Sequence, residues 1–124
     1  MKAFDVKQLD EKDEEVADAL ISLGMSRYVA RTLSYLRNVE EATSFELEKV
    51  TGLRQPEVSI AMKELRERDW VNVREGKKPG KGRPYKIYSL KTSLKKIVAN
   101  LEKQQKRAFD ESQAKIERLR GLRK

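Results

Sequence analysis

The spacing of apolar residues predicts a strongly two-sided helix over residues 55–68. Its apolar side chains fall at i, i+3, i+4 and i+7, which places them on one helix face. These residues are Val58, Ala61, Met62 and Leu65. The opposite face carries Gln55, Ser59, Ile60 and Lys63. A helix of this kind packs one side on a core and leaves the other side free.

A turn is predicted immediately before this helix. Gly52 can adopt the left-handed conformation that ends a preceding helix. Pro56 suits the first turn of a helix, and Gln55, which precedes it, is expected at the cap. A short helix, a turn with glycine and a second helix with a polar outer side form a helix-turn-helix pattern. Residues 55–68 are therefore predicted to be a DNA recognition helix.

Three further helices are predicted before the turn. Residues 10–23 begin with several acids and carry an apolar stripe of Val16, Ala19, Leu20 and Leu23. Residues 27–37 follow Ser26 as N-cap, with Val29, Leu33 and Leu36 as the stripe. Thr43 and Glu46 match a capping box that opens a short helix with Phe45, Leu47 and Val50 directed inward. The acidic start of the first helix is expected to be solvated.

The apolar period changes from 3.6 to 2 after residue 70. Residues 70–74 and 85–90 alternate as strands do, and Trp70 is expected to anchor the first strand on the core. The loop between them contains three glycines and two prolines, which exclude regular structure. Its basic residues are Lys77, Lys78, Lys81 and Arg83. We therefore expect a β-hairpin with a basic tip, here called the wing and assigned to residues 76–84.

Residues 91–122 lack internal proline and glycine apart from Gly121, and they predict one long helix. Its apolar side chains recur at alternating spacings of four and three residues, as in a heptad repeat. The residues in the middle of this seam are polar or small, and the repeat changes phase once near its C-terminal end. The seam residues are Leu94, Val98, Leu101, Ala108, Ile116 and Leu119. Thirty residues span about 45 Å, more than a domain of this size needs. The seam is therefore expected to be a dimer interface, although a helix packed on its own domain remains an alternative.

Charge and composition narrow the possible functions. The net charge is +8, and residues 71–124 carry 17 Lys and Arg against 5 Asp and Glu, whereas residues 1–24 are net acidic. This distribution favours a polyanionic partner such as nucleic acid, although solvated charge is an alternative. The chain has no Cys and no His, so we expect no metal, no cofactor and no enzyme activity. Without an apolar span or signal peptide, a cytoplasmic protein is expected.

Three segments resemble winged helix-turn-helix regulators. Residues 23–33 are similar to the first-helix entry of archaeal TrmB-like proteins, and residues 53–65 to the recognition helix of TrmB-like, ArsR-like and MarR-like proteins. Gly82-Arg83-Pro84 followed by Tyr88-Ser89-Leu90 resembles the wing of archaeal members. The resemblance implies a transcription regulator that binds double-stranded DNA as a homodimer. Metal and sugar sensing are not carried over, because Cys and His are absent and a single helix follows the wing.

The expected fold is mainly α with a small β-hairpin. Three parts are expected along the chain: an N-terminal helical extension over residues 1–24, a winged helix domain over residues 25–90 and a C-terminal dimerisation helix over residues 91–124. The expected DNA contacts are Arg54 on phosphate, Gln55 and Ser59 on base edges, Lys63 on guanine or phosphate, and the four basic wing residues on backbone or minor groove. A plain N-cap at Gln55, a solvated Lys63 and a solubilising wing are the alternatives. Glu57 is expected to favour the helix dipole rather than to bind cytosine.

Two alternative functions remain open on the sequence. A nonspecific, chromatin-like architectural protein would fit the basic charge of residues 71–124. A winged-helix protein-interaction module of the transcription machinery would fit Glu40, Glu41 and the acids of the recognition helix. A small-molecule effector is not indicated by any motif.

Overall fold

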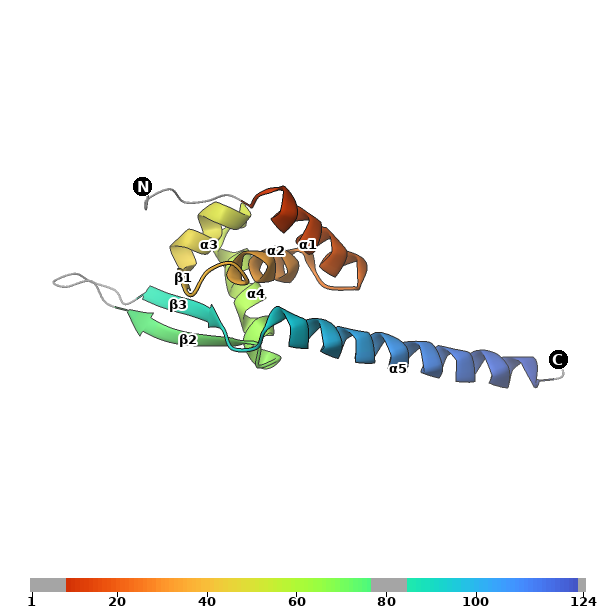
Figure 1. Cartoon of the computed structure of the whole chain (residues 1–124). Helices are drawn as coiled ribbons and strands as arrows, with labels where there is room; N and C mark the ends of the chain where they lie inside the picture. The colour runs from red at the N-terminus through yellow and green to blue at the C-terminus, as the bar shows by residue number, and fades with distance from the viewer. Residues whose placement is uncertain (1–8, 77–84, 123–124) are drawn as a thin grey trace. The chain divides into compact units, whose positions relative to one another are not determined.

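Five helices and three short strands make up residues 9–76 and 85–122, the part of the chain that this computed structural model describes (Figure 1). In order they are α1 (Glu11–Ser22), α2 (Arg27–Leu36), β1 (Ala42–Thr43), α3 (Ser44–Thr51), α4 (Gln55–Glu67), β2 (Val71–Gly76), β3 (Tyr85–Leu90) and α5 (Leu94–Arg120). The predicted class, mainly α with a small β element and a long C-terminal helix, is confirmed. The chain divides into two compact units, Met1–Ser93 and Leu94–Lys124.

α1 starts with a reciprocal cap. The Asp10 carboxylate accepts a hydrogen bond from the backbone N–H of Asp13 at 2.8 Å, and the Asp13 carboxylate accepts one from the N–H of Asp10 at 3.0 Å. The buried side of the helix consists of Asp13, Ala17 and Leu20. The burial of Asp13 is explained by two side chains that follow α2 and donate hydrogen bonds to its Oδ1 atom. Arg37 Nη2 donates at 2.8 Å, and Asn38 Nδ2 donates at 2.6 Å.

The stripe predicted for this helix was therefore wrong in part. Of its four members Leu20 is buried and Val16 half-buried, but Ala19 is exposed and Leu23 is 41% exposed. The helix is rotated so that Asp13 faces its donors. An apolar pattern cannot anticipate this rotation, because the buried position is occupied by a charged residue.

α2 lies at the centre of the Met1–Ser93 unit and packs against α1, α3 and α4. Its buried residues are Val29, Ala30, Thr32, Leu33, Ser34, Tyr35 and Leu36. The three predicted stripe residues are among them, and Ser26 caps the helix by accepting from Val29 N–H at 3.2 Å, as expected. A helix buried on most of its sides belongs to the core rather than to the surface.

α3 begins at Thr43, whose hydroxyl accepts from the backbone N–H of Glu46 at 3.0 Å. Leu47 and Val50 are buried as predicted, but Phe45 is 64% exposed, so that prediction was wrong. The Glu46 carboxylate accepts a hydrogen bond from the Tyr35 hydroxyl rather than reaching back to the cap. Burial raises the pKa of Tyr35 above its ordinary value, and the contact with Glu46 raises it further.

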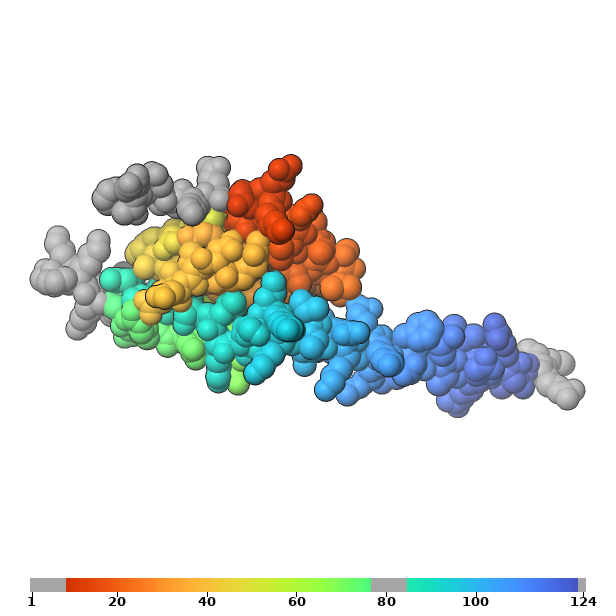
Figure 2. Space-filling view, in the orientation of Figure 1, coloured from red at the N-terminus to blue at the C-terminus, as the bar shows by residue number. Residues whose placement is uncertain are grey.

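The sheet has three antiparallel strands in the order β1-β3-β2, one more than the predicted hairpin. β1 pairs with β3 through Ala42 opposite Tyr88, whereas β2 pairs with β3 from Val71 opposite Leu90 to Gly76 opposite Tyr85. A two-residue strand is too short to show a period in the sequence. In Figure 2 the residues that lead from α2 into α3 reach the surface beside the sheet residues, which are coloured green to cyan.

α4 ends in a sharp turn into the wing strands. Asp69 has a left-handed backbone with φ of 63°, which aspartate tolerates better than most residues. The backbone N–H of Trp70 donates to the Leu65 carbonyl at 3.1 Å, and the Trp70 side chain is buried, as predicted. The start of β2 is therefore fixed to the end of α4.

Candidate nucleic-acid interface

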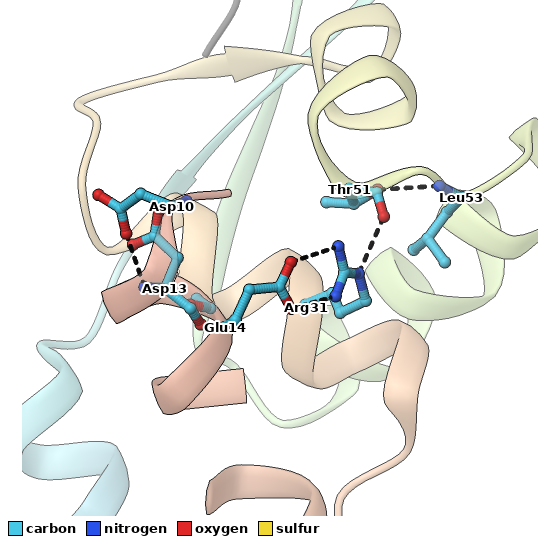
Figure 3. Close-up of polar contacts among 7 residues, drawn as sticks. Asp10, Asp13, Glu14, Arg31, Thr51 and Leu53 are labelled. Carbon is cyan, nitrogen blue, oxygen red and sulfur yellow. Dashed lines mark hydrogen bonds and ion pairs between the residues drawn. The ribbon is translucent and has the colours of Figure 1, made fainter. Parts of the chain in front are cut away.

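The turn between α3 and α4 is held by side chains on both sides. Gly52 has φ of 75°, the left-handed conformation predicted for it. The buried Thr51 hydroxyl donates to the Leu47 carbonyl at 2.6 Å and accepts from Leu53 N–H at 3.2 Å. Arg31 donates from Nε to the Thr51 carbonyl oxygen (Figure 3). The start of α4 is thus placed by a turn with several internal hydrogen bonds.

The first turn of α4 is closed by its own hydrogen bonds. Arg54 is the N-cap, one residue earlier than the predicted cap Gln55, and Pro56 occupies the first turn. The Glu57 carboxylate accepts from the backbone N–H of Arg54 at 2.9 Å. Glu57 is therefore engaged at the helix start, which agrees with the expected dipole role and not with a role in binding cytosine. Pro56 has no N–H, and the N–H of Glu57 donates to the Arg54 carbonyl at 2.9 Å, so the helix start can attract a phosphate through its dipole rather than through a set of free N–H groups.

The two sides of α4 are cleanly divided. Val58, Ala61, Met62 and Leu65 are all buried, as the spacing predicted. The predicted contact residues Gln55, Ser59 and Lys63 are exposed on the other side, and Arg54 is exposed at the cap. Gln55 and Ser59 touch: Gln55 Nε2 donates to Ser59 Oγ at 2.9 Å. The structure thus brings the expected base-reading residues onto one accessible surface, here called the outer side of α4.

Two further residues of α4 were not predicted as contacts. Ile60 is 55% exposed on the outer side. Arg66 is exposed near the end of the helix. Burial raises the pKa of the Tyr88 hydroxyl on β3, and the positive charge of Arg66 partly offsets that rise. In the sequence, Ile60 and Arg66 differ from the buried residues only in lying off the apolar stripe, and this is true of surface residues in general.

The acids of α4 are partly neutralised locally. Glu64 pairs with Arg68 at 3.5 Å. The Arg68 guanidinium also lies 4.9 Å from the centre of the Trp70 ring, a cation–π distance. Both contacts hold the Arg68 side chain at the C-terminal end of α4.

The base of the wing is described, but its tip is not. Lys77, Lys78, Lys81 and Arg83 lie outside the described residues, so their predicted contacts stay predictions. At the base, Arg74 on β2 donates two hydrogen bonds to the Glu41 carboxylate, at 3.1 and 2.7 Å. The hydrogen bonds from Arg74 lower the pKa of Glu41. The wing strands are thereby linked to the segment before β1.

The predicted seam of α5 is largely exposed. Val98 is 45%, Ile116 42% and Leu119 66% exposed, and Ala108 is exposed as well. Leu94 is half-buried and Leu101 buried. Two large apolar residues beside the seam, Phe109 and Leu122, are both 62% exposed. Four large apolar side chains of α5, and Leu122 just after it, are therefore exposed. An exposed apolar surface of this kind is typical of a site that a partner covers.

Other kinds of site are not seen in residues 9–76 and 85–122. No group of three or more His, Cys, Asp or Glu side chains in these ranges is placed to hold a metal ion. None of the helices described is long and apolar enough to cross a membrane.

We compared the chain with models of known protein families. The family model described as MarR family matches residues 23–83, a range that begins before α2 and includes α4 and β2. The chain is therefore similar to the MarR family over residues 23–83, and the elements described in this range have the order of a winged helix-turn-helix. Within this range, α3 and α4 form the helix-turn-helix, and α4 is its second helix. The MarR-like part of the predicted resemblance is confirmed, and the chain has the fold of DNA-binding transcription regulators.

One solved structure shares this fold, and two others are less similar. A possible transcriptional regulator from Methanosarcina mazei Go1 has a TM-score of 0.64 at 18% identity over 85% of this chain and 86% of that one. The oxidized form of MarR from E. coli has a TM-score of 0.46 at 21% identity, over 76% and 62%. Bordetella bronchiseptica BpsR, whose DNA binding is regulated by 6-hydroxynicotinic acid, has 0.46 at 18%, over 90% and 82%. No curated protein matches this chain.

Proposed function

We propose that this protein is a sequence-specific regulator of transcription that binds double-stranded DNA as a homodimer. The observation that carries the proposal is the outer side of α4. It presents Gln55, Ser59 and Lys63 to solvent from a helix whose other side is fully packed and whose start is fixed by the turn. A rigid helix with exposed hydrogen-bonding residues fits the major groove, where each base pair shows a distinct pattern of donors and acceptors.

In this proposal affinity and specificity come from different elements. α4 contains similar numbers of acids and bases, so it adds little net attraction to DNA. The basic residues that follow α4, including the wing residues Lys77, Lys78, Lys81 and Arg83, neutralise phosphates and release counterions. Arg54 and the positive end of the α4 helix dipole fix the register on the backbone.

The dimer is proposed to form through the exposed apolar side of α5. A two-fold dimer places two copies of α4 one DNA turn apart, about 34–36 Å, in successive major grooves. The 27 residues of α5 are about 40 Å long, which leaves room for an extended seam. Leu94, Val98, Leu101, Ala108, Ile116 and Leu119 would contribute to it.

Selection of bound sequences from random duplex DNA tests the proposal directly. A specific regulator enriches one sequence and retains it in excess random duplex at moderate salt. An architectural protein binds without enrichment, and a protein-interaction module shows no useful affinity under these conditions. Either of the last two results would contradict the proposed function. Sedimentation of the free protein tests the dimer separately.

A further inference from the structure

We propose that Ile60 makes the recognition surface selective for thymine, by packing against the C5-methyl group in the major groove. The proposal rests on the proposed function, because it assigns a base to one side chain of α4. It differs from the contacts expected of Gln55, Ser59 and Lys63, which are all made through hydrogen bonds or charge.

The exposure of Ile60 is the first argument. The Ile60 side chain is 55% exposed, although the helix buries four other apolar residues on its opposite side. In the described part of the Met1–Ser93 unit, the other large apolar residues exposed to this degree are Leu23, at the end of α1, and Phe45, on α3. Of these three exposed apolar residues, Ile60 is the one on the outer side of α4. An apolar residue there gains stability when a partner covers it.

The position of Ile60 on the helix is the second argument. An α-helix advances about 100° per residue, which places Ile60 and Lys63 close to the middle of the side opposite Val58, Ala61, Met62 and Leu65. Ser59 and Gln55 lie toward one flank of that side. When a helix enters a groove, the residues at the middle of its outer side reach deepest. Ile60 would therefore meet the floor of the groove.

The chemistry of the groove decides which base fits. The base edges in the major groove offer hydrogen-bond donors and acceptors, and the thymine C5-methyl group is their one apolar element. An isoleucine placed against guanine or cytosine would remove polar atoms from water without replacing their hydrogen bonds, which is unfavourable. Against thymine it buries a methyl group instead. The surface chemistry of Ile60 thus favours thymine over guanine and cytosine.

The hydrogen bond between Gln55 and Ser59 is consistent with a neighbouring adenine. Gln55 Nε2 donates one of its two hydrogens to Ser59 Oγ at 2.9 Å, which leaves its second hydrogen and the Oε1 atom available. A donor and an acceptor side by side are what the major-groove edge of adenine requires. Adenine and thymine occur as one pair, so a surface with both features prefers A·T pairs.

Replacement of thymine by deoxyuridine provides the test, because the two bases differ in the groove by the methyl group alone. The sequence enriched by the wild-type protein from random duplex is resynthesised with each thymine replaced in turn. For the wild type we expect about threefold to fivefold weaker binding at one or two positions, the size expected for one buried methyl group. The Ile60→Ala variant should bind the thymine duplex as weakly as the wild type binds the deoxyuridine duplex, and should not distinguish the two.

The controls separate this inference from the proposed function. Phe45→Ala removes an equally exposed apolar side chain that is not on α4, and it should leave the thymine preference unchanged. Circular dichroism should show that both variants are folded, since both side chains are exposed. Enrichment of a sequence without any thymine preference, or a preference that persists in Ile60→Ala, would overturn this inference alone. Absence of any enriched sequence would overturn the proposed function and this inference together.

Discussion

Arg31 on α2 donates a hydrogen bond from Nε to the backbone carbonyl oxygen of Thr51, 2.9 Å away at the end of α3. The same guanidinium makes two hydrogen bonds to the Glu14 carboxylate of α1, at 2.6 and 3.2 Å (Figure 3). One side chain therefore connects the first helix to the turn that places α4. The position of the recognition surface depends on a residue that cannot itself reach a base from this location.

Substitution of Arg31 by alanine should lower the free energy of unfolding by about 1–3 kcal/mol, because the Thr51 carbonyl and the Glu14 carboxylate lose a charged donor. Urea unfolding followed by circular dichroism would measure the change. The matched control is Arg27→Ala, which removes an exposed arginine from the same helix and should change stability by less than about 0.5 kcal/mol. Equal effects of the two substitutions would show that the contact with Thr51 adds nothing.

The buried carboxylate of Asp13 should make stability depend on pH. Burial by itself would raise the pKa of Asp13, but the hydrogen bonds from Asp10 and Asn38 and the charge of Arg37 outweigh burial and hold the pKa below its ordinary value. Because the folded pKa is depressed, the stabilisation is present above the unfolded pKa and is lost as the pH falls through the folded value.

Asp13→Asn should therefore lower the unfolding free energy near neutral pH by about 1–3 kcal/mol and flatten its decline in acid. Thermal or urea unfolding between pH 7 and the acid range would measure both effects. Asp18→Asn is the control, because Asp18 is an exposed acid on the same helix. A pH profile of Asp13→Asn that is parallel to the wild type would rule out this role.

If the protein is the proposed dimer, Leu119→Asp should convert it into monomers, because a charge would have to be desolvated within the apolar seam. Leu119 is a better position for this test than Leu101, since Leu119 is 66% exposed and Leu101 is already buried. Sedimentation velocity would give the oligomeric state. Lys103→Asp places the same residue on the opposite side of α5 and should remain dimeric. If Leu119→Asp also stays dimeric, the C-terminal part of α5 is not the interface.

Replacement of Lys81 and Arg83 by alanine should weaken binding to every duplex, because the proposed wing contacts go to the backbone or to a narrow minor groove. If both residues neutralise phosphates, the slope of log affinity against log salt should decrease by about 2 per protomer. Titrations at several salt concentrations would measure this slope. Loss of affinity for the enriched sequence alone, or no loss, would argue against the wing as a backbone contact.

The sequence predicts best those elements in which local pattern and tertiary packing agree. Four apolar positions of α4, the left-handed Gly52 and the Thr43 cap were all predicted, because spacing, backbone freedom and capping chemistry are local properties. The two wing strands followed from the change of period for the same reason.

The predictions that were wrong depend on distant contacts. The register of α1 follows from Arg37 and Asn38, which lie 24 and 25 residues beyond Asp13. Glu46 binds Tyr35 instead of its own cap, and β1 exists only because β3 supplies its hydrogen-bonding partner. Ile60, by contrast, was placed on the free side of its helix by the sequence pattern alone, and its exposure agrees with that placement.

The division of α4 into a packed side and an outer side has a consequence for how this regulator could diverge. Exchanges at Gln55, Ser59, Ile60 and Lys63 touch no buried residue of the helix, so each should alter stability by less than about 0.5 kcal/mol. Gene duplication followed by change at these positions would give a paralogue with a new target sequence and an intact scaffold. The same freedom makes the outer side of α4 a practical place to redesign target choice in the laboratory.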